Sequence, residues 1–141
     1  MLDRSTPDGA RIAERLDREE YAYFTSVRPD GRPHTVPVCF LWDGATILIF
    51  SLPDTVKCRN IRQNPQVSFT LEIGRITPEN VPITVEGTAA LVDEPGIEFM
   101  MPAYAAKYAP LADRLGATLE GLARMYTQAI RLTPTRFRLD P

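Results

Sequence analysis

The sequence is poor in the residues that mark disulfide-rich or metal-binding proteins. It contains only 2 cysteines and 1 histidine in 141 residues. Cys39 and Cys58 lack the spacing of metal ligands, so we expect two reduced thiols. A single histidine excludes any site built from several histidines. We therefore expect no bound metal.

Long apolar runs are also missing. No stretch approaches the roughly 18 residues that a membrane-spanning helix needs. Residues 1–20 carry charges throughout and lack the apolar segment of a signal peptide. The formal net charge of −2 gives no general attraction to nucleic acid or anionic membranes. These absences predict a soluble cytoplasmic protein, and the length predicts a single domain over residues 1–141.

The common catalytic motifs are absent too. The chain has no G-x-S-x-G elbow, no Walker loop and no dinucleotide fingerprint. The pair Asp93-Glu94 precedes Pro95-Gly96 and is typical of a helix start rather than of paired acid and base carboxylates. The sequence therefore indicates no catalytic residue.

The pattern of apolar residues predicts mainly β-strands. Alternating or continuous apolar residues predict them over residues 21–28, 35–42, 45–50, 66–73, 83–92 and 128–139. Helical patterns cover residues 7–18, which Thr6 and Pro7 begin, a short segment near Lys57, and two segments within residues 95–126. We expect a mainly β fold, a small closed or nearly closed antiparallel barrel with helical insertions.

Glycine and proline mark the local breaks in this pattern. Asp43-Gly44 predicts a two-residue hairpin turn, and Gly87 indicates a bulge in its strand. Pro110 is expected to end one helix before the last helix begins near Leu115. Pro134 is expected to interrupt the final strand, because proline cannot donate a ladder hydrogen bond.

Residues 34–64 carry the clearest functional pattern. Two predicted strands are followed, within residues 51–60, by two hydroxyls, a helix start, a lysine and an amide: Ser51, Thr55, Lys57 and Asn60. A helix N-terminus offers unpaired N–H groups and a partial positive charge, so a lysine there indicates a phosphate site. The alternative is a solvated helix face, which is also the expected place of Arg59 and Arg62.

Pro37 lies in the middle of the strand predicted over residues 35–42. Since proline has no N–H, one side of the strand is expected to be unpaired there. Either Pro37 marks a plain edge or bulge, or the strand presents its backbone to a flat ring. In the second case, free N–H and C=O groups of Val36 and Val38 would address the polar edge of the ring. The strand and the helix start together suit a phosphorylated aromatic cofactor.

Two other residues are weaker candidates. His34 follows a Gly-Arg-Pro turn and is more typical of a strand start than of a catalyst. Trp42 either packs at the end of the barrel or contacts a ligand, and packing is favoured.

Four segments in this order resemble the pyridoxamine-phosphate-oxidase-like family of flavin-binding split barrels. They are AYFTSVRPDGRPHTVPVCFLW, ILIFS, TVKCRNIRQNPQVSFTLE and VEGTAALVDEP, and the resemblance covers most of residues 10–94. The pattern K-x-R-N-x-R-x-x-P before a strand is its most specific part. The chain is most similar to the branch that uses the deazaflavin coenzyme F420. The resemblance implies a six-stranded antiparallel split β-barrel of the FMN-binding type.

The resemblance also implies a cofactor site and an assembly. Family members form homodimers that hold the cofactor between subunits, and residues 99–126 are available to build the second wall. Residues that match the phosphate end are Lys57 and Asn60, with Ser51 and Thr55 nearby, and those that match the ring-facing strand are Val36, Pro37 and Val38. Several relatives have an arginine where this chain has Thr55, which makes the phosphate site less positive.

The leading hypothesis is an F420-dependent oxidoreductase that passes a hydride to a small organic acceptor such as a quinone or an enone. The cofactor supplies the chemistry and the protein orients it. The alternatives are the same fold holding FMN, or a flavin- or haem-binding module without turnover. No partner among nucleic acids or membranes is expected.

Overall fold

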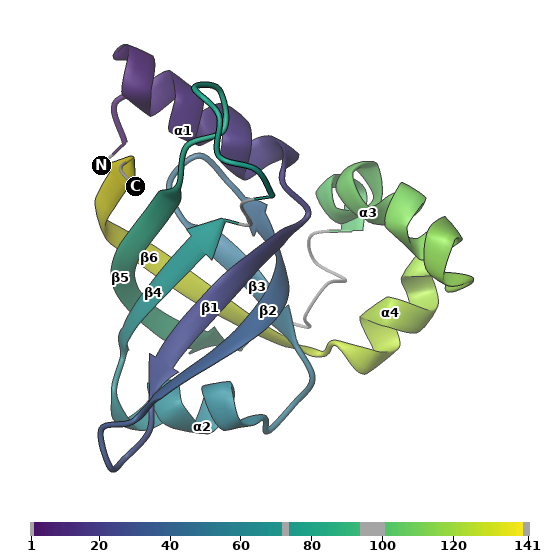
Figure 1. The fold of residues 1–141 in the computed structure, drawn as a ribbon. Coiled ribbons are helices and arrows are strands. Elements are labelled where there is room, and N and C mark those ends of the chain that lie inside the picture. Colours follow the sequence, from purple (N-terminus) through teal and green to yellow (C-terminus); the bar gives the residue numbers. More distant parts are fainter. Residues whose placement is uncertain (1, 72–73, 94–100, 140–141) are drawn as a thin grey trace.

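The computed structural model describes residues 2–71, 74–93 and 101–139. Within these ranges the chain forms six strands and four helices (Figure 1). In chain order they are α1 (Pro7–Arg18), β1 (Tyr21–Val27), β2 (Pro33–Trp42), β3 (Ile47–Ser51), α2 (Val56–Gln63), β4 (Gln66–Leu71), β5 (Ile83–Val92), α3 (Met101–Leu115), α4 (Leu119–Met125) and β6 (Gln128–Leu139). The expected strand end at residues 72–73 and helix start at residues 95–100 lie outside the described residues.

The strands close into one antiparallel barrel in the order β1-β2-β3-β6-β5-β4. Alternate residues of each strand fill its interior, where the rings of Phe40 and Phe69 meet edge to face at 4.9 Å between centroids. The helices are insertions around this barrel, so the chain is mainly β. The predicted six-stranded split-barrel fold is confirmed.

One edge of β2 is open over much of its length. Its pairing with β1 covers residues 33–39, whereas its pairing with β3 covers only residues 40–42. Within the described chain, residues 33–39 therefore have a partner strand on one side only. The gap between β2 and β3 is the opening beside which α3 and α4 lie (Figure 1).

The turn between β2 and β3 is longer than the predicted two residues. It covers residues 43–46, and β3 begins at Ile47 rather than at residue 45. The Asp43 carboxylate accepts hydrogen bonds from the N–H groups of Ala45 and Thr46, at 2.9 and 2.6 Å. The side chain thus closes a wider turn than the Asp-Gly pair suggests.

Pro110 does not end a helix, contrary to the prediction. α3 continues through it to Leu115, and the break comes at Gly116, which has φ 66°. Pro110 and Ala106 are both exposed, so the carbonyl that the proline leaves without a donor can face water. The last helix starts later than predicted, at Leu119, after Thr118 caps it through the N–H of Gly121.

Pro134 does not interrupt the final strand either. β6 is continuous, and Pro134 lies opposite Gly87 where the register with β5 shifts. The pairing is irregular at Gly87, as predicted, but the extra residue, Thr135, belongs to β6 and not to the strand of Gly87. This irregularity accommodates the missing N–H of Pro134 without ending the strand.

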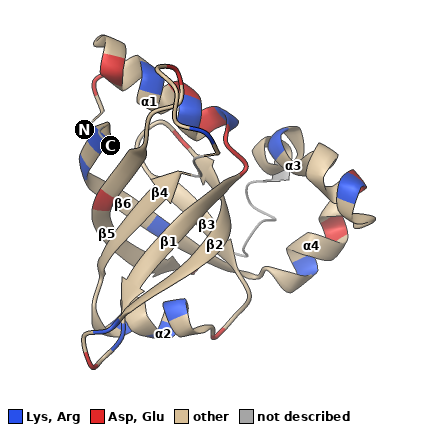
Figure 2. Cartoon of the chain, in the orientation of Figure 1, with Lys and Arg blue, Asp and Glu red and all other residues tan. Residues whose placement is uncertain are grey.

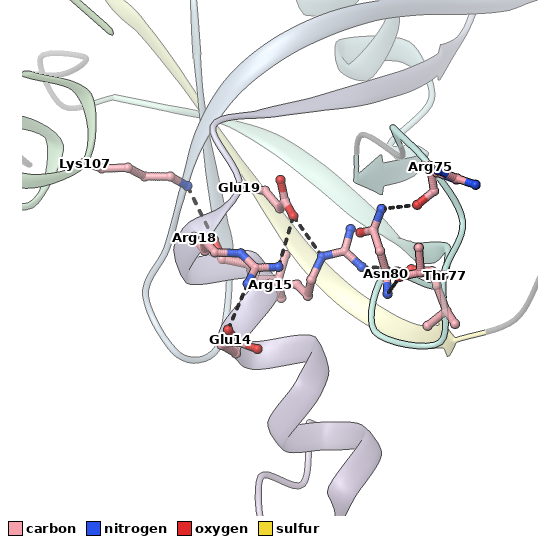
Figure 3. Close-up of polar contacts among 10 residues, drawn as sticks. Glu14, Arg15, Arg18, Glu19, Arg75, Thr77, Asn80 and Lys107 are labelled. Carbon is pink, nitrogen blue, oxygen red and sulfur yellow. Dashed lines mark hydrogen bonds and ion pairs between the residues drawn. The ribbon is translucent and has the colours of Figure 1, made fainter. Parts of the chain in front are cut away.

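A buried arginine fastens α1 to the barrel. The Arg15 guanidinium donates to Glu19 at 2.9 Å and to the carbonyl oxygen of Val81 at 2.8 Å. The loop that contains Val81 is held in turn by Asn80, which donates to the Arg75 carbonyl at 2.7 Å (Figure 3). Because the buried charge has a carboxylate and a carbonyl as partners, it holds this end of the barrel. α2 covers the other end (Figure 1).

Candidate functional site

A cavity of about 340 Å³ lies beside the open edge of β2. β1, β2 and the end of β3 form one wall, α3 and α4 form the other, and α2 contributes its first residues. Most lining side chains are aromatic or aliphatic. Of the described residues that line the cavity, only Lys57 carries a full charge. This combination of apolar walls and one cation is typical of a small-molecule site.

The chain turns sharply into α2 at the edge of this cavity. Asp54 has φ 57°, which is uncommon for a residue other than glycine. Thr55 is the N-cap residue, but its side chain makes no capping hydrogen bond, and its hydroxyl donates to the Cys58 sulfur at 3.2 Å instead. No acidic residue lies in the first turn. The first N–H groups of α2 are therefore available to an anion.

Lys57 adds a cation to this helix start. Its side chain is half-buried and lines the cavity, and it makes no hydrogen bond or ion pair within the described part of the chain. Burial lowers the pKa of the ammonium, because water solvates the charged form less well there. A bound anion would restore the lost solvation, so Lys57 suits a phosphate ligand.

Two of the predicted site residues lie beneath the cavity. Ser51 is fully buried, donates to the Leu52 carbonyl at 2.6 Å and contacts the Thr55 hydroxyl at 3.1 Å. Asn60 is 3 % exposed and donates to the Ser26 hydroxyl at 3.0 Å. These contacts hold α2 against β3 and β1, and thereby fix where Lys57 stands.

The strand beside the cavity contributes Pro37 and Val38; Val38 is also part of the buried barrel core, and Val36 packs against that core. The N–H of Phe40 donates to the Tyr108 hydroxyl at 3.0 Å, and that hydroxyl donates to the backbone carbonyl of Glu20, next to β1, at 2.6 Å. The backbone groups of Phe40 therefore point to the β1 side.

Backbone groups alternate in direction along a strand, so those of Val36 and Val38 also point to β1. The expectation that these two residues address a ligand with free N–H and C=O groups is corrected. The free groups on the open edge belong to the residues between and after them, Pro37 and Cys39. Burial raises the pKa of the Cys39 thiol, which lines the cavity in its neutral form.

Lys107 and Tyr108 fasten α3 over the cavity. The Lys107 ammonium donates to the Phe40 carbonyl at 3.1 Å and lies 3.7 Å from the centre of the Phe40 ring. It also donates to the Leu16 carbonyl at the end of α1, as Figure 3 shows. Burial lowers the pKa of Lys107 to about 8 and raises that of Tyr108 well above its ordinary value. The α3 wall is thus tied to the barrel backbone.

The sequence predicts that residues 99–126 help to build a second wall between subunits, but not that α3 and α4 form a wall within the chain. This wall brings Tyr104, Leu111, Leu122 and Tyr126 to the cavity. The helical spacing of apolar residues in this segment was visible, but it does not say what the helices cover. In the structure their described residues cover the chain's own cavity.

His34 and Trp42 are not among the residues that line this cavity. His34 lies at the start of β2, and burial, with the Arg28 and Lys57 cations nearby, lowers its pKa. Its Nδ1 atom is buried with no hydrogen-bond partner among the described residues. Trp42 packs edge to face on Phe137, at 6.2 Å between centroids, and borders a second cavity of about 490 Å³.

No group of three or more His, Cys, Asp or Glu side chains among the described residues could hold a metal ion. None of the helices described is long and apolar enough to cross a membrane.

Comparison with known proteins places these features in a family. Residues 9–139 match the family model for pyridoxamine 5'-phosphate oxidase. No curated protein matches the sequence. Among solved structures, the chain is similar to an F420 reductase with 28% identity and a TM-score of 0.62, covering 90% of this chain and 95% of the other.

Two further structures are similar in fold. One is a haem storage protein from Vibrio cholerae, with 19% identity, a TM-score of 0.66, and 92% of each chain covered. The other is general stress protein 26 from Bacillus anthracis, with 19% identity, a TM-score of 0.65, and 91% and 89% covered. Since the family match spans nearly the whole chain, the resemblance expected from the sequence is confirmed, and the chain belongs to the pyridoxamine 5'-phosphate oxidase family.

Proposed function

We propose that this chain is an F420-dependent oxidoreductase acting on a small organic acceptor such as a quinone or an enone. The family and the similarity to an F420 reductase support the broader assignment to flavin-type oxidoreductases. The observation that carries the proposal is the cavity that joins Lys57, at the uncapped start of α2, to the open edge of β2. A phosphate and a flat ring need these two features side by side.

Each predicted residue has a role in this proposal. Lys57, the Thr55 hydroxyl and the first N–H groups of α2 hold the phosphate. Pro37 and Val38 face the ring. Ser51 and Asn60 position α2 from beneath, through the hydrogen bonds to Thr55 and Ser26. Val36 supports the strand from the core side.

The α3 and α4 wall excludes water from the reacting face. Its apolar side chains, Leu111 and Leu122 among them, favour an uncharged acceptor in the same cavity. When bound, the reduced coenzyme supplies the hydride. Because Lys57 is committed to the phosphate, we assign the proton to solvent rather than to a side chain.

FMN in the same site is the alternative, since FMN also combines a phosphate with a flat ring. The two cofactors differ in the acidic tail that F420 carries and FMN lacks. We expect F420 to bind more tightly than FMN at low salt, with the difference shrinking as salt screens charges beyond about 8–10 Å. Calorimetric titration of the purified protein at low and high salt measures both affinities.

Three outcomes decide between the candidates. Tighter F420 binding at low salt supports the proposal. Equal affinities, or tighter FMN binding, would favour the FMN alternative. Binding of either cofactor without any turnover of quinone or enone acceptors would identify a carrier module instead.

We further propose a homodimer with the cofactor at the subunit interface. The outer face beside the ring-facing edge of β2 carries apolar rings, Tyr21 and Tyr23, that are 36% and 45% exposed, and a second copy of the chain would cover them. Light scattering at micromolar concentration with cofactor bound should give twice the mass of the chain. A monomer under these conditions would contradict this part of the proposal.

A further inference from the structure

Two arginines of α2 share the carboxylate of Asp54. An Arg62 guanidinium nitrogen lies 3.6 Å from one carboxylate oxygen of Asp54, and an Arg59 nitrogen lies 3.9 Å from the same oxygen. Arg59 also donates to the backbone carbonyl of Asp54 at 2.6 Å. The Asp54 carboxylate thus partly neutralises both cations.

This cluster lies in solvent, outside the cavity. The side chains of Asp54, Arg59 and Arg62 are 75%, 55% and 52% exposed, and none of them lines the cavity. Exposed ion pairs contribute little to stability, so another carboxylate can replace Asp54 at little cost. The contact is a weak and exchangeable one.

The cluster also stands next to the proposed phosphate site. Asp54 directly precedes Thr55, which lines the cavity, and Arg59 reaches back to the Asp54 carbonyl at 2.6 Å, so the cluster adjoins the start of α2, a helix on which basic residues gather (Figure 2). Asp54 precedes the N-cap residue, and no carboxylate lies in the first turn of α2 itself. A ligand whose phosphate is held at Lys57 would carry any further acidic groups out past these arginines.

We propose that Asp54 is a specificity-determining residue that competes with the acidic tail of a cofactor for Arg59 and Arg62. The tail carboxylates displace the Asp54 carboxylate from the two arginines. Asp54 stays negatively charged nearby and therefore repels the bound tail. The Asp54 carboxylate therefore reduces the preference for an oligoanionic cofactor over one that ends at its phosphate. This inference rests on the proposed function only in placing the phosphate at Lys57.

The test is Asp54→Asn, with affinities for F420 and FMN measured by calorimetry at low and high salt. Asparagine keeps the side-chain shape and tolerates the positive φ of this position, so the fold should be retained. At low salt the variant should bind F420 at least about threefold more tightly than the wild type does, as expected when a repulsive surface charge is removed. FMN affinity should stay within about twofold, and the gain for F420 should vanish at high salt.

Two matched variants sharpen the result. Asp17 on α1 also carries an exposed carboxylate, which lies 3.7 Å from Arg4. Asp17→Asn removes it and should change neither the F420 nor the FMN affinity. The double variant Arg59→Gln, Arg62→Gln should weaken F420 binding by about threefold or more and leave FMN binding unchanged.

The outcomes distinguish failure of this inference from failure of the proposed function. If Asp54→Asn left F420 affinity unchanged while the wild type bound both cofactors, only the role of Asp54 would be overturned. The same holds if both cofactors gained equally, since Asp54 would then act on the phosphate. A wild type that bound neither cofactor would overturn the proposed function together with this inference.

Discussion

Replacing Lys57 by alanine is expected to weaken the binding of either cofactor more than about tenfold, because a charge-assisted hydrogen bond is worth about 1.5–3 kcal/mol. Lys57 is the one charged residue among those that line the described cavity, and it has no counter-ion in the described chain. Nothing else there replaces its charge. Calorimetric titration of Lys57→Ala with FMN and with F420 measures the loss.

The control keeps the helix and removes a different cation. Arg62→Ala takes an exposed charge from the same helix and should leave FMN affinity within about twofold. The unfolding temperature of Lys57→Ala should not fall, because a partly buried cation without a partner does not stabilise the fold. A Lys57→Ala protein that bound both cofactors like the wild type would disprove the phosphate assignment.

Gly87→Ala is expected to lower the free energy of unfolding by about 3 kcal/mol, which is the upper end of the usual cost of overpacking. A Cβ atom at this position would meet the Thr133 carbonyl oxygen at 2.3 Å and a methyl carbon of Leu132 at 3.0 Å. Both belong to β6, which pairs with β5 here, so the two strands would have to separate. Chemical denaturation, followed by circular dichroism, measures the change.

Gly74→Ala is the matched control for this substitution. A Cβ atom there meets nothing within 4 Å, and the residue is not among those with positive φ. Its free energy of unfolding should stay within about 0.5 kcal/mol of the wild type. Equal effects of the two substitutions would contradict the close approach of β5 and β6 at the bulge.

The barrel was predictable because its strands carry local signals. Apolar residues alternate along β2 and β4, and β3 is apolar from Ile47 to Phe50, so the apolar pattern alone located these strands. The start of α2 was visible for a similar reason, since Lys57 follows directly on a strand and a turn. One glycine in an otherwise regular strand indicated the irregular pairing at Gly87, although the extra residue lies opposite it on β6.

The remaining features depend on contacts between segments far apart in the chain. The Tyr108 hydroxyl forms hydrogen bonds with Phe40 and Glu20, which are 68 and 88 positions away in the sequence. No local sequence pattern predicts such contacts. The burial of Asn60 follows from its bond to Ser26, 34 positions away. The wider turn at Asp43 is set by the rotamer of one carboxylate, which the Asp-Gly pair does not determine.

The open edge of β2 has a consequence for association between molecules. Unpaired strand edges invite a strand from another chain, which is a common start of aggregation. Four residues of β2, at positions 33, 35, 37 and 39, direct their backbone groups to this edge, and two of them, Pro33 and Pro37, have no N–H. A strand arriving from another molecule would find half of the donors missing. The two prolines therefore keep the barrel from growing into a larger sheet.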